Sequence, residues 1–101
     1  MEKKRPTYDL EAIKLALGSV ETLAMTSSAL RDALALGFDR NGVAEPIAAV
    51  ERHMFVKTMT TFADHRVWQD VYYVPARGLV LYVKFQADVI TEFVVMSFKE
   101  K

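Results

Sequence analysis

The fold is decided by residues 66–99, whose sequence is RVWQDVYYVPARGLVLYVKFQADVITEFVVMSFK. β-Branched and aromatic residues dominate this stretch, and apolar side chains recur with the period of two that is typical of strands. We expect three strands, at about 66–74, 79–88 and 92–99, with a hairpin loop at 75–78 between the first two. In the second strand, one face is wholly apolar and consists of Leu79, Leu81, Val83 and Phe85. This alternation predicts a sheet that is covered on one side.

Three helices are predicted upstream of the strands. The first covers residues 8–17, where apolar side chains recur at helical spacing. The second begins after a hydroxyl cap at Thr26 or Ser27. The third follows a turn at residues 41–42 and has Pro46 in its first turn. A weakly alternating segment at residues 20–25, VETLAM, further predicts a short strand between the first two helices.

The order of these elements indicates the fold class. Helices come first and a meander of strands comes last, so we expect an α+β fold with the N-terminal helices packed on one face of an antiparallel sheet. At 101 residues the chain is one domain's worth of sequence, and we expect a single domain over residues 1–101.

Composition excludes several classes of protein. Hydrophobic residues make up 51% of the chain and charged residues 26%, which is typical of a globular protein and not of a disordered one. The absence of cysteine excludes disulfide scaffolds and zinc–thiolate sites and is compatible with a cytoplasmic location. The longest apolar run, Leu79–Val83, is too short for a membrane helix, and the basic start MEKKRP is not followed by the apolar stretch of a secretion signal.

Motifs for cofactors and metals are missing. The four glycines, at positions 18, 37, 42 and 78, are too far apart for a dinucleotide fingerprint or a phosphate loop. The two histidines, at positions 53 and 65, are twelve residues apart and have no thiolate partner. No serine lies between glycines as in a nucleophile elbow. We therefore expect no cofactor and no metal.

Polar side chains on the predicted strands are the informative ones. Gln69, Tyr82 and Lys99 occur once per strand, and alternation allows all three to point away from the helices. Lys57, upstream, is within reach of the same surface. The candidate catalytic residues are therefore Lys57, Gln69, Tyr82 and Lys99, with Arg66 and Lys84 as candidate substrate-binding residues. Ammonium, phenol and amide groups together suit a phosphodiester held by cations while a weak acid or base moves a proton.

Plainer interpretations of the same residues stay open at this point. Lys84 and Lys99 are also typical of solvated strand residues that prevent edge-to-edge association. Tyr82 is equally suited to pair with Tyr73 on the sheet surface. The adjacent Asp64 and His65 suggest a catalytic dyad, but such a pair in a loop is commonly a turn feature.

Two segments carry a resemblance to a known family. They are KTMTTFADHRVWQDVY at residues 57–72 and VMSFKEK at residues 95–101, and the start MEKKRP agrees with them. Together they resemble the MqsR family of bacterial toxins. The resemblance implies a RelE-like α+β fold, an mRNA interferase activity and a type II toxin–antitoxin pair whose antitoxin binds DNA.

The resemblance also assigns residues and chemistry. It implies functional roles for Lys57, Gln69, Tyr82 and Lys99, the four residues already grouped above, whereas Val56 departs from the aromatic residue of the family pattern. It further implies metal-independent cleavage of single-stranded mRNA at a short GC-containing, GCU-like site, with attack by the 2′-hydroxyl. The expected partners are the mRNA and a neutralising antitoxin, with no membrane and no direct binding of DNA by the toxin alone.

Two other classes of function compete with this one. The first is a non-catalytic module that binds RNA or the ribosome, and the second is a protein-interaction domain with a patch of Trp68, Tyr72 and Tyr73. The net charge of zero does not exclude RNA, because residues 52–101 carry seven basic and five acidic side chains. RNA affinity is therefore expected to depend on a local cluster.

Overall fold

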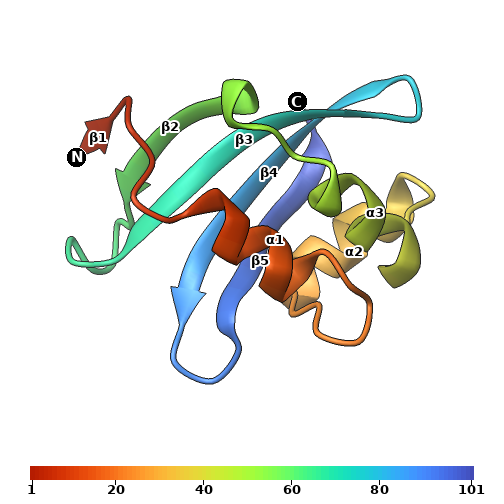
Figure 1. The fold of residues 1–101 in the computed structure, drawn as a ribbon, viewed down its shortest axis with the longest axis horizontal. Coiled ribbons are helices and arrows are strands. Elements are labelled where there is room, and N and C mark those ends of the chain that lie inside the picture. The colour runs from red at the N-terminus through yellow and green to blue at the C-terminus, as the bar shows by residue number, and fades with distance from the viewer.

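The computed structural model describes residues 1–101 and shows three α-helices packed against one five-stranded sheet, with α1 and α3 in front of it in Figure 1. The helices are α1 (Leu10–Leu17), α2 (Ser27–Ala35) and α3 (Arg40–Ala48), followed by the 3-10 turn η1 (Arg52–Met54). The strands are β1 (Glu2–Lys3), β2 (Phe55–Thr60), β3 (Trp68–Ala76), β4 (Leu79–Asp88) and β5 (Glu92–Glu100). Every neighbouring pair is antiparallel, in the order β1-β2-β3-β4-β5. The predicted α+β class is confirmed, while its RelE-like detail stays a prediction.

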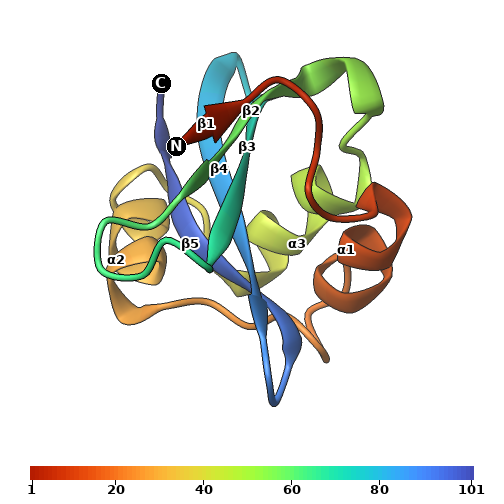
Figure 2. The ribbon, with the colours of Figure 1, turned by 90° about the vertical axis from the view of Figure 1, so that its left-hand side faces the viewer.

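One apolar core joins the helices to the sheet. In Figure 2, α1 and α3 lie on the right of the sheet and α2 lies on the left, alongside the β5 strand it packs against. The core of eighteen buried residues includes Ile13 and Leu17 of α1. It also includes Leu81, Val83 and Phe85 of the predicted apolar face of β4, and the partly buried Leu79 packs against it. Just before α2, Met25 forms a parallel bridge to Val95 and so partly covers the edge of the sheet at β5, whereas the two-residue strand β1 forms the other edge.

Side-chain caps determine where the helices begin. Asp9 accepts a hydrogen bond from the backbone of Glu11 at the start of α1, and Thr26 accepts one from Ala29 at the start of α2. The predicted start of α3 was wrong, because Asp39 caps this helix by accepting from Gly42. Residues 41–42 are therefore helical, and Pro46 lies in the last turn.

Two segments before β3 differ from the prediction. Residues 20–25 form turns with a single bridge to β5, so the predicted strand there was wrong. The strand β2, in contrast, was missed because the third helix was expected to continue toward Lys57. Its register shifts between Phe55 and Lys57, so Val56 is an extra residue that breaks the alternation by which strands are identified.

A second bulge lies in β5. Lys84 is paired with Ser97 and the next residue, Phe85, with Val95, so Met96 is the extra residue. The strict alternation predicted for residues 92–99 was wrong for this reason. Phe98 faces the core together with Phe93 and Val95, and the bulge turns Ser97 and Lys99 to the opposite side. A one-residue irregularity thus places a lysine on the face away from the helices.

The hydroxyl of Tyr72 leads to a stability prediction. Tyr72 is fully buried, its hydroxyl has no hydrogen-bond partner, and burial followed by the charge of Asp70 raises its pKa to about 12. Tyr72→Phe should therefore increase the free energy of unfolding by about 1 kcal/mol, measured by urea denaturation, because it removes an unsatisfied polar group. The raised pKa favours the neutral native phenol, so the wild type should lose stability from about pH 10 to pH 12 and the variant should lose less.

The matched control is Tyr73→Phe. Tyr73 is only half-buried on the other face of the same strand, so removal of its hydroxyl should leave stability nearly unchanged. A loss of stability in Tyr72→Phe would show that its hydroxyl has a partner in solution.

Candidate phosphate site on the open sheet face

Side chains of β2 to β5 form three rows on the side of the sheet opposite α1 and α3, which we call the open face. Residues paired across neighbouring strands point to the same side, so the register defines each row. The central row is Lys57, Val71, Lys84 and Ser97. One flanking row is Tyr73, Tyr82 and Lys99. The other flanking row is Met59, Gln69, Gln86 and Val94. The open face thus unites all four candidate catalytic residues with Lys84.

Three ammonium groups share one local field on this face. The pKa of Lys84 is lowered by burial first, and then by repulsion from Lys99 and Lys57. The ammonium of Lys57 lies 3.4 Å from a carboxylate oxygen of Glu2, whereas neither Lys84 nor Lys99 forms an ion pair. Uncompensated positive charge of this kind is suited to hold an anion such as a phosphodiester.

Tyr82 lies among these lysines. Its ring centroid is 5.5 Å from the ammonium nitrogen of Lys99 and 6.3 Å from the centroid of Tyr73. Burial raises the pKa of the Tyr82 phenol, and the positive charge of Lys57 partly opposes this effect. The phenol therefore stays protonated at neutral pH and is suited to donate a proton or a hydrogen bond.

Gln69 is the most buried of the candidate residues. The residue is 8% exposed, and its amide nitrogen donates to the amide oxygen of Gln86 across a distance of 2.8 Å. The sequence interpretation missed Gln86, although this residue follows Tyr82 and Lys84 at the period of two on the same strand. It also missed Glu2, because no pattern in the sequence indicated the two-residue strand β1.

Comparison with known proteins identifies the family. Residues 5–100 match the family described as "Motility quorum-sensing regulator, toxin of MqsA". The chain belongs to the MqsR toxin family. It is also 39% identical, over an alignment of 103 positions that covers 100% of both chains, to the mRNA interferase toxin MqsR of Escherichia coli (strain K12). The MqsR match includes all four strands of the open face, and the resemblance seen in the sequence is confirmed.

One candidate residue of this MqsR-family chain lies apart from the rows. Arg66 lies in the loop at residues 61–67 between β2 and β3, where its guanidinium nitrogen is 3.1 Å from a carboxylate oxygen of Asp64. The hydrogen bond from Arg66 holds the pKa of Asp64 below its usual value. Asp64 also accepts from the backbone of Arg66, which confirms the turn interpretation of Asp64 and His65. Substrate binding by Arg66 stays a prediction.

The structure contradicts two of the plainer interpretations, although Lys99 does lie on the outer strand β5 and Tyr82 does lie beside Tyr73. β4 lies between β3 and β5, so Lys84 is not an edge residue that prevents association. The proposed aromatic patch was wrong, because Tyr72 is fully buried and the ring of Trp68 lies under the ammonium of Lys3 at 4.3 Å.

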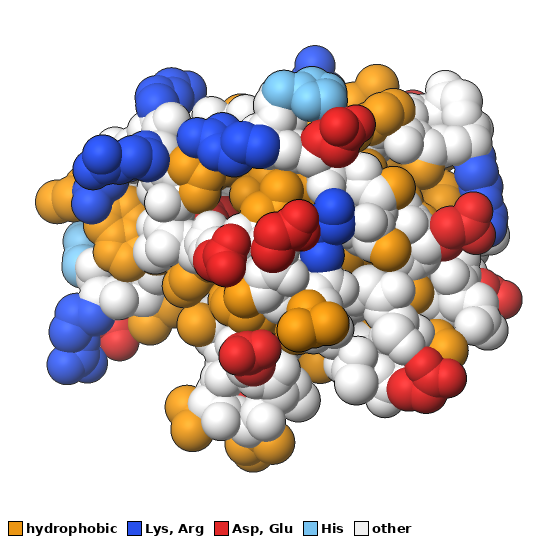
Figure 3. Space-filling view, viewed as in Figure 1, with side chains coloured by type: hydrophobic (Ala, Val, Ile, Leu, Met, Phe, Trp, Pro, Cys, Tyr) orange, Lys and Arg blue, Asp and Glu red, His pale blue; other side chains and the backbone are white.

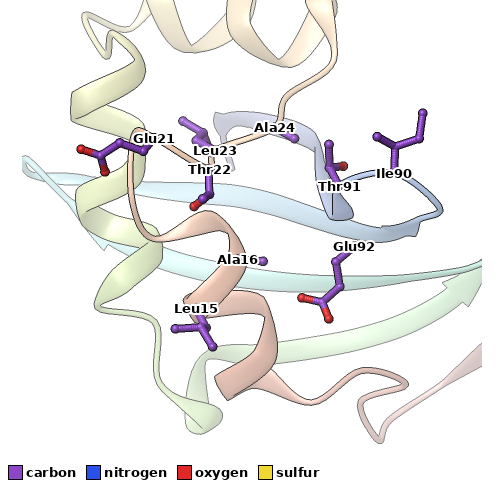
Figure 4. A pocket seen from close by; sticks show the side chains of 9 residues that line it. All are labelled: Leu15, Ala16, Glu21, Thr22, Leu23, Ala24, Ile90, Thr91 and Glu92. Atoms are coloured by element: carbon purple, nitrogen blue, oxygen red, sulfur yellow. The ribbon is translucent and has the colours of Figure 1, made fainter.

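A hollow lies on the helix side of the sheet. It measures about 630 Å³, and Figure 4 shows its lining between α1, residues 21–24 and the hairpin of β4 and β5. Glu21 and Glu92 line it, which makes it unfavourable for RNA phosphates. The helix side as a whole mixes acidic and basic side chains, with basic ones most frequent near β1 and β2 (Figure 3).

Two further kinds of site are absent from the chain. No three side chains of His, Cys, Asp or Glu converge in the arrangement of a metal site. No helix combines the length and apolar character needed to cross a membrane.

Lys84→Met should increase the stability of this MqsR-family chain and decrease its affinity for RNA. At pH 7 the variant should unfold at a higher urea concentration, because the native site disfavours the Lys84 ammonium by burial and like charge. Because the pKa of Lys84 is lowered in the native state, the wild type gains stability as the pH rises from that pKa toward 10.5. The difference in stability between the variant and the wild type should therefore shrink over this range. RNA affinity should fall, and the slope of log affinity against log salt should decrease by about 0.7. Lys4→Met, at an exposed position, is the control, and a less stable Lys84→Met protein would contradict this account.

Proposed function

We propose that this chain is the toxin of a type II toxin–antitoxin pair and acts as an endoribonuclease that cuts single-stranded mRNA in the cytoplasm. The gathering of Lys57, Lys84 and Lys99 around the Tyr82 phenol on the open face is the observation that carries the proposal. The name of the Escherichia coli relative, mRNA interferase toxin, supports it. The partner is a neutralising, DNA-binding antitoxin, in agreement with the family description, toxin of MqsA.

The proposed reaction needs only groups that the RNA, the open face and the solvent provide. The 2′-hydroxyl loses its proton to the solvent and attacks the adjacent phosphorus, the bond from phosphorus to the 5′-oxygen breaks, and the products are a 2′,3′-cyclic phosphate and a 5′-hydroxyl. Lys57 and Lys99 stabilise the negative charge of the pentavalent phosphorus, and Lys84 binds substrate. Gln69 orients a phosphoryl oxygen through the amide hydrogen that Gln86 does not accept.

Tyr82 supplies the proton that the leaving 5′-oxygen takes. Its neutral phenol agrees with this direction of transfer. Lys and Tyr have reference pKa values of about 10, so neither is an efficient base for the 2′-hydroxyl at neutral pH. Because the base step is weak, we expect a slow enzyme whose rate rises with pH until the lysines lose their protons. The GC-containing recognition triplet follows from the family resemblance alone.

A defined RNA oligonucleotide tests the proposal. Purified wild-type protein should cut single-stranded RNA in the presence of a chelator and leave a cyclic phosphate and a 5′-hydroxyl on the two products. A single 2′-deoxy substitution at the mapped site should abolish that cut and leave binding nearly intact. Binding without cleavage products would favour the non-catalytic RNA module, and a lack of RNA affinity would favour the protein-interaction domain.

A further inference from the structure

A hollow lies at one end of the open face, and the proposed reaction assigns no ligand to it. It measures about 660 Å³ and lies between the flanking row of Met59, Gln69 and Gln86 and the β2–β3 loop at residues 61–67. Lys84 of the central row also lines it. The hollow is therefore continuous with the lysines that are proposed to hold the scissile phosphate, and a nucleotide bound there would direct an adjoining group into it.

The amide pair at the base of the hollow presents a donor beside an acceptor. The single hydrogen bond between Gln69 and Gln86 leaves the amide nitrogen of Gln86 with both hydrogens unused and the amide oxygen of Gln69 free. If both amides are rotated by 180°, the free donor and acceptor exchange places, and the pattern remains. Adjacent donors and acceptors match the edges of nucleobases, which glutamine side chains bind in a bidentate manner.

Apolar groups complete the hollow in a way that suits a flat ring. Phe62 lines it from the loop and is fully exposed, at 102% of its reference area. A phenylalanine that contributes nothing to the core provides a free aromatic face on which a base can stack. Met59 and Met96 add flexible thioether side chains that adapt to a planar ligand.

We propose that this hollow, the base pocket, binds one nucleobase of the RNA next to the phosphate held by Lys84. In it, Phe62 stacks on the base, and Gln86, held in place by Gln69, forms hydrogen bonds with its edge. The proposal rests on the function proposed above and adds two residues to it, Phe62 for affinity and Gln86 for selection of the base.

The test measures coupling between the pocket and single nucleotides, that is, whether a substitution in the pocket and the loss of one base have non-additive effects on RNA affinity. An RNA oligonucleotide carrying the 2′-deoxy substitution at the mapped cut is made with one abasic position at a time, and its affinity is measured by fluorescence anisotropy. The proteins are wild type, Phe62→Leu, Gln86→Met and the control Ile90→Ala, whose side chain is 92% exposed in the hairpin of β4 and β5. Thermal denaturation verifies that each variant is folded.

The expected result is coupling at one position. There, an abasic nucleotide should weaken binding to the wild type about tenfold and binding to Phe62→Leu only slightly, since the variant has already lost the aromatic ring on which the base stacks. Gln86→Met should reduce discrimination among the four bases at that position and leave the other positions unchanged. Ile90→Ala should behave like the wild type.

Equal losses in wild type and Phe62→Leu at every abasic position would overturn the base pocket. The same conclusion follows if Gln86→Met keeps the wild-type base preference. A wild type that cleaves RNA but shows no coupling refutes the pocket and leaves the proposed function intact. If cleavage is absent, the scan covers every nucleotide of the bound oligonucleotide: coupling then supports the pocket and refutes the nuclease, and an absence of binding refutes both.

Discussion

Replacing Lys99 with alanine should slow RNA cleavage about 100- to 1,000-fold, the loss typical when one preorganised donor to a developing negative charge is removed. Lys99 is paired with Tyr82 across β4 and β5, and its ammonium lies 5.5 Å from the phenol ring centroid. Its charge contributes to the lowered pKa of Lys84, so it acts within the same field. The measurement is the single-turnover rate on a defined RNA with wild-type and variant protein at equal, saturating concentration.

Stability should not account for that loss. Lys99 is exposed and forms no ion pair, so its removal should leave the midpoint of thermal unfolding unchanged. Lys101→Ala is the matched control: the Lys101 ammonium lies 4.7 Å from the ring centroid of Tyr73, on the margin of the same surface. It should reduce the rate only slightly. A folded Lys99→Ala protein that cleaves at the wild-type rate would remove Lys99 from the mechanism.

Replacing Asp70 with alanine should lower the free energy of unfolding by about 3 kcal/mol. Asp70 is fully buried on the helix side of β3, and its two carboxylate oxygens accept from the backbone of Thr7 at 3.1 Å and of Tyr8 at 2.9 Å. These bonds attach the segment before α1 to the middle of the sheet. Alanine would leave both backbone donors without this acceptor. Urea denaturation at pH 7 measures the loss.

The contrast with another aspartate makes the Asp70 prediction specific. Asp64→Ala removes a carboxylate that also accepts backbone and side-chain hydrogen bonds, but in an exposed loop, so its effect on stability should be small. A similar stability of the two variants would show that the attachment of residues 7–8 to β3 contributes little. If it contributes as expected, Asp70→Ala should also release β1, and with it the contact between Glu2 and Lys57.

Local patterns in the sequence predicted much of this fold. The second predicted strand, residues 79–88, agrees with β4 at both ends, and Thr26, one of the two predicted hydroxyl caps, caps α2. These features depend on neighbouring residues alone: side-chain hydrogen bonds to nearby backbone, helical spacing and strict alternation. The family resemblance likewise rested on continuous stretches, at residues 57–72 and 95–101.

The errors arose where distant segments decide the conformation. β2 contains an extra residue at Val56, and its hydrogen bonds go to β1 and β3. Likewise, the predicted strand at residues 20–25 contributes only Met25 to the sheet, because α2 follows it and packs along β5. The turn predicted at residues 41–42 did not form, because the side chain of Asp39 caps the helix by accepting a hydrogen bond from the backbone of Gly42.

For the open face, the sequence by itself determined which chemical groups are present: lysines, a tyrosine and a glutamine at strand spacing, without cysteine or a glycine-rich phosphate loop. Only the tertiary structure decided which of them meet. The bulge at Met96 turns Lys99 toward Tyr82, the register of β3 with β4 joins Gln69 to Gln86, and both depend on hydrogen bonds between strands. In a regular strand, the spacing of residues along the chain determines which face of the sheet each side chain points to. The pairing between strands determines which side chains are neighbours, and bulges change both.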